Sequence, residues 1–178
     1  YGRTKLAGDQ IIRRSCANHL IFRTSWVYAA RGSNFAKTML RLAKERDQLK
    51  VVADQVGAPT SAELIADVTA LILYRISQSG ALPASLPGIY NLVAGGHTTW
   101  HGYAQYVLEL AEAKGVRLKV GAGSVLPISP DSYPLPARRP KNSRLSTEKL
   151  CATFNLHLPD WRHHLQRLID ELVTQGSS

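Results

Sequence analysis

The sequence predicts an α/β protein whose sheet is largely parallel. Short apolar runs that are typical of buried strands alternate along the chain with longer segments of helical periodicity. Such alternation favours parallel strands connected by crossover helices. The composition of the 178 residues, 44% hydrophobic and 20% charged, agrees with a globular chain that buries a sizeable core.

The first half of the chain begins with a predicted helix at residues 2–16 and a single buried strand at residues 19–28. A second helix follows, and its apolar stripe occupies positions i, i+4, i+7 and i+8: Phe35, Met39, Leu42 and Ala43. Residues 49–54 are expected to form a short strand. Residues 54–60 contain Gly and Pro and are expected to form a turn.

A third helix is predicted after this turn. Thr60 and Glu63 have the spacing of a capping box, in which the first side chain caps the helix and the second bonds back to the cap. The inner face of this helix is expected to carry Val68, Leu71 and Ile72.

The remainder of the chain contains a strand, two helices and a long irregular segment. Residues 88–96 are expected to contain the strand, and residues 120–145, rich in Pro, to form a binding loop. The helix between them carries an apolar stripe of Tyr103, Val107, Leu110 and Ala111. The last helix carries a stripe of Trp161, Leu165, Leu168, Ile169 and Leu172. His163 and His164 are expected to be exposed positions of this last helix. They are not expected to be ligands, because adjacent helical residues point about 100° apart and do not easily share one site.

The charge balance narrows the classes of partner. The formal net charge of +9 favours an anionic partner. The basic residues are scattered and are not interleaved with aromatic residues, as a stacking platform for nucleic acid would require. A phosphate-bearing small molecule fits the charge equally well, and a solvated basic surface explains most of these residues, so no nucleic-acid partner is expected. No apolar run approaches the roughly 18 residues of a membrane span, so no membrane is expected either. Cys16 and Cys151 are expected to be reduced, partly buried thiols of a cytoplasmic protein.

The opening stretch YGRTKLAGDQ places Tyr1 and Lys5 four residues apart, and hence on one face of a helix. A phenol ordinarily has a pKa near 10, and a neighbouring ammonium lowers it, which makes such a pair a usable general acid for carbonyl reduction. The spacing alone also fits an ordinary exposed pair on a helix. No GxGxxG motif follows a strand, so the sequence does not contain the phosphate-cradling turn of a dinucleotide-binding fold.

Five blocks of sequence together carry a resemblance to a known family. They are YGRTKLAGD, HLIFRTSWVYAARGSNFAKTMLRLAKER, DQVGAPTSAELIAD, YNLVAGGHTTWHGYA and RPKNSRLSTEKL. In this order they resemble the C-terminal part of the dTDP-4-dehydrorhamnose reductases, which are extended short-chain dehydrogenase/reductases. The resemblance implies the C-terminal part of a Rossmann-type fold with a small α/β substrate-binding domain. Residues 1–30 would end the dinucleotide-binding domain. Residues 31–178 would mainly bind substrate, with some segments returning to the Rossmann sheet.

The family reduces the 4-keto group of dTDP-6-deoxy-L-lyxo-4-hexulose with NADPH or NADH. The product is dTDP-L-rhamnose, used for bacterial surface polysaccharide such as lipopolysaccharide O-antigen. The resemblance thus implies a cytoplasmic oxidoreductase with a dTDP-sugar substrate. Two alternatives stay open: another nucleotide-sugar reductase or epimerase, and a non-catalytic binding member. Which nicotinamide cofactor is preferred is not readable from this sequence.

The resemblance also assigns site residues. Tyr1 would donate the proton to the C4 oxygen, and Lys5 would hold the nicotinamide ribose. Thr24 and Trp26, at the end of a strand, would lie beside the nicotinamide, with Trp26 also forming an apolar wall for the sugar. The remaining substrate-binding assignments are Asn34, Gln55, Arg139 and Asn142, with Ser143 accompanying Asn142. Three of these substrate assignments have a purely structural alternative. Trp26 would then be a core residue, Ser33 or Asn34 a helix cap, and Gln55 a turn residue.

Magnesium-dependent dimers occur in this family, with carboxylates implicated. Glu63 matches one such carboxylate, but its capping-box role explains it, and Arg162 stands where a second acidic residue would be expected. The Arg162 departure speaks against a metal site, while a need for Mg²⁺ and a homodimer of the intact protein both stay open. Because the family's Gly-rich loop and its catalytic Ser or Thr find no match, we also expect a fragment that begins at the catalytic tyrosine and is inactive alone.

Overall fold

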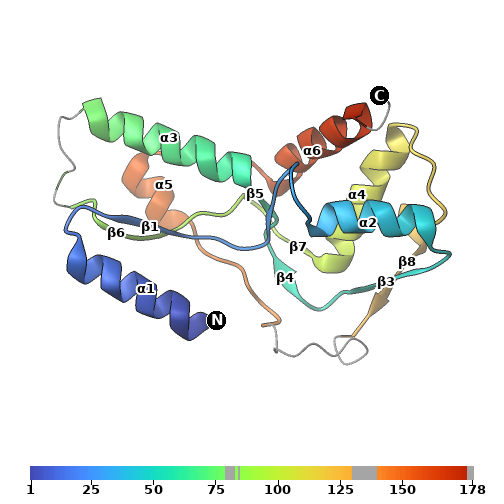
Figure 1. Cartoon of the computed structure of the whole chain (residues 1–178), viewed down its shortest axis with the longest axis horizontal. Coiled ribbons are helices and arrows are strands. Elements are labelled where there is room, and N and C mark those ends of the chain that lie inside the picture. Colours follow the sequence, from blue (N-terminus) through green and yellow to red (C-terminus); the bar gives the residue numbers. More distant parts are fainter. Residues whose placement is uncertain (79–82, 84, 130–139, 176–178) are drawn as a thin grey trace.

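Two lobes make up the computed structural model, which describes residues 1–78, 83, 85–129 and 140–175 (Figure 1). One lobe contains α1 (Gly2–Ser15), β1 (Leu20–Arg23), α3 (Ala62–Gln78), β6 (Gly88–Asn91) and α5 (Glu148–Phe154). The other contains α2 (Phe35–Glu45), β3 (Leu49–Val52), α4 (Trp100–Ala113), the 3₁₀ turn Ala122–Ser124, β8 (Val125–Ile128) and α6 (Trp161–Gln175). Between them lie β2 (Val27–Tyr28), β4 (Val56–Gly57), β5 (Thr60–Ser61) and β7 (Thr98–Thr99).

The strands of the described part of the chain form two-stranded pairs. The pairs β1–β6, β2–β5 and β3–β8 are parallel, and β4–β7 is antiparallel. Each parallel pair joins strands far apart in sequence, because a parallel connection needs a crossover of a dozen or more residues. The predicted α/β class with mainly parallel pairing is confirmed.

The prediction of one buried strand over residues 19–28 was wrong. Strand β1 ends at Arg23, and β2 begins only at Val27. Between them Trp26 adopts φ 50°, in the left-handed region that non-glycine residues rarely occupy. Because β1 pairs with β6 in one lobe whereas β2 pairs with β5 between the lobes, the chain changes direction at Trp26.

Two segments predicted to be irregular contain strands. The expected turn at residues 54–60 contains β4 and the start of β5, and most of it is buried. The expected loop at residues 120–145 contains β8, which runs parallel to β3. Pro127 obscured this strand, since proline is confined to edge positions where no N–H is needed for pairing.

The predicted helical stripes agree with burial in α2, α4 and α6, whereas α3 requires two corrections. The Ser61 hydroxyl, not Thr60, caps α3 by accepting a bond of 3.0 Å from Leu64 N. Thr60 is buried, and its hydroxyl donates to Ala58 O at 3.1 Å and accepts from Ala94 N at 3.2 Å. The buried stripe is Leu64, Val68 and Ile72. Leu71 is 40% exposed, so its predicted inward position was wrong.

Two further expectations are corrected by burial. His164 is buried, whereas its neighbour His163 is exposed as predicted. Helix α6 contacts both α4 and β5, so a wider part of its circumference is covered than one apolar stripe requires. Cys16 is exposed rather than partly buried, and Cys151 is half-buried; both are free thiols.

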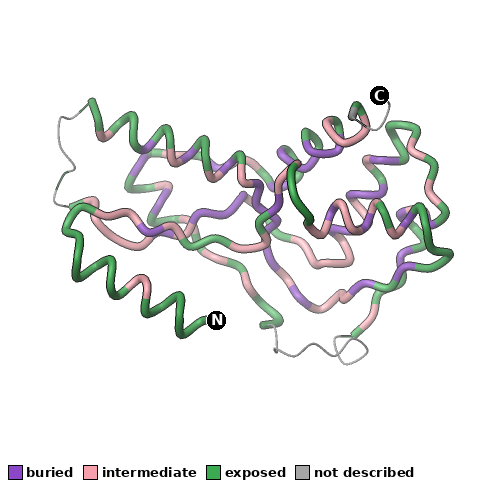
Figure 2. Tube along the Cα trace, in the orientation of Figure 1, coloured by how far each residue is buried: buried purple, intermediate pink, exposed green. Residues whose placement is uncertain are grey.

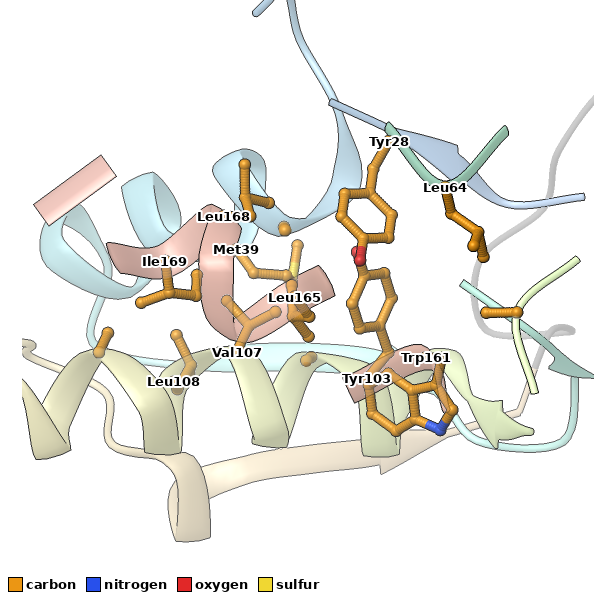
Figure 3. Packing of buried hydrophobic residues seen from close by; sticks show 14 of the residues in the cluster. Tyr28, Met39, Leu64, Tyr103, Val107, Leu108, Trp161, Leu165, Leu168 and Ile169 are labelled. Atoms are coloured by element: carbon orange, nitrogen blue, oxygen red, sulfur yellow. The ribbon is translucent and has the colours of Figure 1, made fainter. Parts of the chain in front are cut away.

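The core centres on α4, which is covered by α2 and α6 (Figure 3). Its buried members include Tyr103, Val107 and Leu108 on α4, with Leu165 and Ile169 on α6. Burial continues between the lobes, whereas α1 has no buried residue along its whole described length (Figure 2). None of the described helices is long and apolar enough to cross a membrane.

Candidate functional site

The structure brings Tyr1 and Lys5 together at the start of α1. Tyr1 occupies the N-cap position, and its carbonyl accepts a bond of 3.1 Å from the Lys5 backbone N–H. The Lys5 ammonium lies 5.4 Å from the centroid of the Tyr1 ring. Because Tyr1 is 93% exposed, its hydroxyl is accessible to a reacting group.

Trp26 lies at the break between β1 and β2 in a confined position. Its indole stacks on that of Trp100, with centroids 3.7 Å apart and planes inclined by 11°. A Cβ on Gly57 would lie 2.5 Å from Trp26 Cε2, so only glycine leaves room for this ring. The Trp26 carbonyl accepts a bond of 3.2 Å from Thr60 N. A left-handed non-glycine residue costs of order 1–3 kcal/mol, and these contacts hold Trp26 in that conformation.

Trp100 had no role assigned to it from the sequence. Its ring stacks on one face of the Trp26 indole and packs against Phe35 as well. It is the first residue of α4, whose cap Thr99 accepts a bond of 3.0 Å from Gly102 N. Its ring packs at 4.6 Å from that of Phe35, which in turn stacks at 5.2 Å on buried Tyr103. Trp26 is thus the outer member of an aromatic series that begins in the core.

A chain segment that contains Asn142 and Ser143 pairs with Val56 of β4, the residue after Gln55. Val56 N donates to Lys141 O at 2.8 Å, and Ser143 donates to Val56 O through both N (2.9 Å) and Oγ (3.0 Å). Val56 forms a parallel bridge with Asn142, and Ser143 Oγ lies 2.7 Å from the Cβ position of Gly57, beside Trp26. Gln55 is buried, directly before this bridge.

Charged side chains border this pairing of β4 with the segment at Asn142. Asn142 Oδ1 accepts from Arg144 N (3.1 Å) and Nε (3.0 Å). Lys141 Nζ lies 3.4 Å from Asp54 Oδ2. Arg139, the Arg assigned to substrate, lies outside the described residues.

Asn34 and Thr24 occupy simpler positions. Asn34 caps α2: its Oδ1 accepts from Lys37 N at 3.1 Å, and its Nδ2 donates to Ala29 O at 2.6 Å. The competing prediction of a helix cap at this position is therefore confirmed, and a substrate contact by Asn34 stays a prediction. Thr24 is exposed directly after the carboxyl end of β1.

Glu63 lies near the buried side chains of Tyr28 and His164 rather than in a group of carboxylates. Its Oε2 is 4.0 Å from Arg167 Nη1. Burial, and secondly the charge of Glu63, raise the pKa of Tyr28. Burial, and secondly the neighbouring Tyr28, raise the pKa of Tyr103. The Tyr28 and Tyr103 side chains point toward one another (Figure 3). Within the described ranges, no group of three or more His, Cys, Asp or Glu residues could hold a metal ion.

His164 is buried near Glu63, and its surroundings predict a pH dependence of the free energy of unfolding. Burial lowers the pKa of His164, as do His163 and Arg167, whereas Glu63 and Asp67 oppose this shift. An unfolded histidine has a pKa near 6.5, so below that pH the unfolded chain binds a proton that the folded chain does not. The free energy of unfolding should therefore fall as pH drops from about 7, by at most about 1.4 kcal/mol per pH unit from this group.

Urea unfolding between about pH 5 and pH 7.5 measures this term. His164→Leu should flatten the profile, and His157→Gln, a change at an exposed histidine, should leave it unchanged. An identical slope in wild type and His164→Leu would show that His164 is not responsible.

The fold is that of the extended short-chain dehydrogenase/reductases: parallel strand pairs covered by helices, with a Tyr–Lys pair opening the first helix. A family model described as the RmlD substrate binding domain matches residues 1–174, and the chain belongs to this family. The resemblance noted from the sequence is confirmed.

Curated relatives extend along nearly the whole chain. The dTDP-4-dehydrorhamnose reductase of Shigella flexneri is 54% identical over 174 residues, which are 98% of this chain and 56% of that protein. That of Escherichia coli K12 is 52% identical with the same coverage. The chain thus spans little more than half the length of these relatives.

Solved structures agree with this relationship. The dTDP-4-dehydrorhamnose reductase from Bacillus anthracis, solved in complex with NADP, is 36% identical with a TM-score of 0.79. The match covers 96% of this chain and 55% of that one. A UDP-N-acetylglucosamine 4-epimerase from Bacillus cereus, at 16% identity and a TM-score of 0.62, shares the fold.

Proposed function

We propose that this chain provides the Tyr–Lys pair and the sugar-binding part of a dTDP-4-dehydrorhamnose reductase. The observation that carries the proposal is that the Lys5 ammonium lies 5.4 Å from the centroid of the exposed Tyr1 ring at the start of one helix. Curated reductases of that name, more than 50% identical over almost the whole chain, support it. The cytoplasm as compartment, a homodimer of the intact protein and a role in surface polysaccharide synthesis belong to the same proposal.

In the proposed reaction Tyr1 donates its phenolic proton to the C4 oxygen of the 4-keto sugar as carbonyl becomes hydroxyl. Lys5, one helical turn away, stabilises the phenolate that remains and donates hydrogen bonds to ribose hydroxyls. Thr24 is proposed to lie beside the nicotinamide. A bound NADPH or NADH would supply the hydride. Exposed Tyr1 and Lys5 fit such a ligand, because neither side chain is covered by the rest of the chain.

Substrate contacts are proposed for five residues of this chain. Trp26 provides an apolar face for the sugar, and Gln55 and Asn142 provide amide groups near it. Arg139 is proposed to bind the diphosphate, since an Arg fork matches phosphate oxygens in a way that an ammonium cannot. Asn34 is proposed to act near the N-terminus of α2, where backbone N–H groups favour anions.

A chimera tests the proposal. This chain is joined to the part of the Shigella flexneri relative that it does not cover, and NADPH oxidation is followed with a panel of 4-keto sugars. We expect consumption of dTDP-6-deoxy-L-lyxo-4-hexulose and formation of dTDP-L-rhamnose. Preference for a sugar on another nucleotide would assign the chain to a different reductase or epimerase. No turnover, while the Shigella flexneri protein is active in parallel, would favour a non-catalytic member.

A further inference from the structure

Trp26 and Trp100 form a stacked indole pair whose two members differ in surroundings. Trp100 is anchored on α4 and packs against Phe35, and through it against buried Tyr103. Trp26 comes from the bend between β1 and β2, in a left-handed conformation. Both indoles are half-buried and pack against the core, but Trp100 contacts it through Phe35, whereas Trp26 belongs to the bend.

The orientation of the Trp26 ring is fixed from two directions. Trp100 covers one face at 3.7 Å, with planes within 11° of parallel. Cε2 and Cζ2 lie 2.5 and 2.7 Å from where a Gly57 Cβ would be. Trp26 is only half-buried, so part of its indole stays exposed. An indole whose plane is held in this way can present that exposed part to a ligand at a set angle.

We infer that Trp100 is a positioning residue for sugar recognition: it sets the plane of the Trp26 indole and makes no contact with the ligand itself. The inference rests on the proposed function, since it assumes that Trp26 contacts the sugar of a nucleotide-linked substrate. A preorganised aromatic face binds more tightly because its rotamer freedom is already lost before binding. Left-handed strain at Trp26 fits this role, since such strain is found where surroundings hold a functional side chain in place.

The first test needs no ligand. Two stacked indoles give a coupled circular dichroism signal, which Trp26→Leu and Trp100→Leu should each abolish. Trp161→Phe, a change at the third and buried tryptophan, should retain it. In Trp100→Leu the Trp26 fluorescence should also become more accessible to acrylamide. A coupled signal that survives Trp100→Leu would show that Trp100 does not hold Trp26 in place.

The second test measures affinity of the chimera for dTDP-L-rhamnose and for dTDP. Each single Leu variant should lose about tenfold in affinity for dTDP-L-rhamnose, the size expected for a tryptophan that anchors a ligand. Affinity for dTDP should be unchanged, and Trp100→Phe should recover most of the loss. Because Trp100 acts through Trp26, the double variant should lose no more than either single one.

The outcomes separate the two claims. If the wild-type chimera fails to bind dTDP-L-rhamnose, the proposed function fails, and the positioning role in recognition fails with it. If the wild type binds but Trp100→Leu binds equally well, the inference alone is overturned. Losses that multiply in the double variant would mean that Trp100 touches the sugar directly. Equal losses for dTDP and dTDP-L-rhamnose would reduce Trp100 to general structural support.

Discussion

Replacing Tyr1 with Phe in the chimera is expected to lower turnover by about 10²–10⁴, the usual contribution of a positioned general acid. The change removes only the hydroxyl, whereas the ring that lies beside the Lys5 ammonium is retained. Affinity for NADPH should therefore remain nearly intact. Steady-state turnover and a separate cofactor titration measure the two quantities.

A matched control is available on α3. Tyr74 is also exposed, at 62%, and lies outside the proposed site, so Tyr74→Phe should leave turnover unchanged. Lys5→Met should lower turnover and also weaken NADPH binding, because Lys5 is proposed to contact the ribose. A loss of less than tenfold for Tyr1→Phe would argue that another group supplies the proton.

Local periodicity was sufficient to predict much of the fold. The stripe of Trp161, Leu165, Leu168 and Ile169 on α6 is buried as predicted, because side chains at these spacings share one face whatever the helix packs against. The pairing of Tyr1 with Lys5 follows from the same geometry. These features depend only on residues within a few turns of one another.

The features that were missed depend on distant partners. Thr60 and Ser61 both have cap chemistry, but the Thr60 hydroxyl is engaged by Ala94 N, so Ser61 caps α3. The bend at Trp26 arises because β1 and β2 pair with strands in different parts of the molecule. Trp100 supports Trp26 from the start of α4, far along the chain. No window of sequence contains these contacts, and they become visible only when the lobes are assembled.

The helix that carries the proposed catalytic pair is weakly attached to the rest of the described chain. All of α1 is described, and none of it is buried; Leu6, Ile11 and Ile12 are 50%, 63% and 44% exposed. A salt bridge from Arg23 to Asp9, at 2.7 Å, connects α1 to β1. Surface ion pairs of this kind contribute about 0–1 kcal/mol, too little to hold a helix of this length in place.

We therefore expect the 178-residue chain alone to show no NADPH-dependent reduction and no measurable NADPH binding in a calorimetric titration. The sequence has no Gly-rich turn for the cofactor's pyrophosphate, and the described residues bury no side chain of α1 that would fix Tyr1 and Lys5. Limited trypsin digestion should cleave after Arg13 and Arg14 at least about tenfold faster than after Arg41 and Lys44, because exposed helices with few apolar contacts open most readily.

The comparison within α2 is what makes this digestion informative. Arg41 and Lys44 are exposed like Arg13 and Arg14, but their helix buries Ala36, Met39 and Ala43. Arg41 is also ion-paired with Glu45, so Lys44 is the site at which exposure is matched and packing differs. In the chimera, α1 gains a surface to pack against, and both NADPH binding and protection of Arg13 and Arg14 should appear together. Micromolar NADPH affinity of the chain alone, or equal resistance of the α1 and α2 sites, would show that α1 is already held in a working arrangement without the added part of the Shigella flexneri relative.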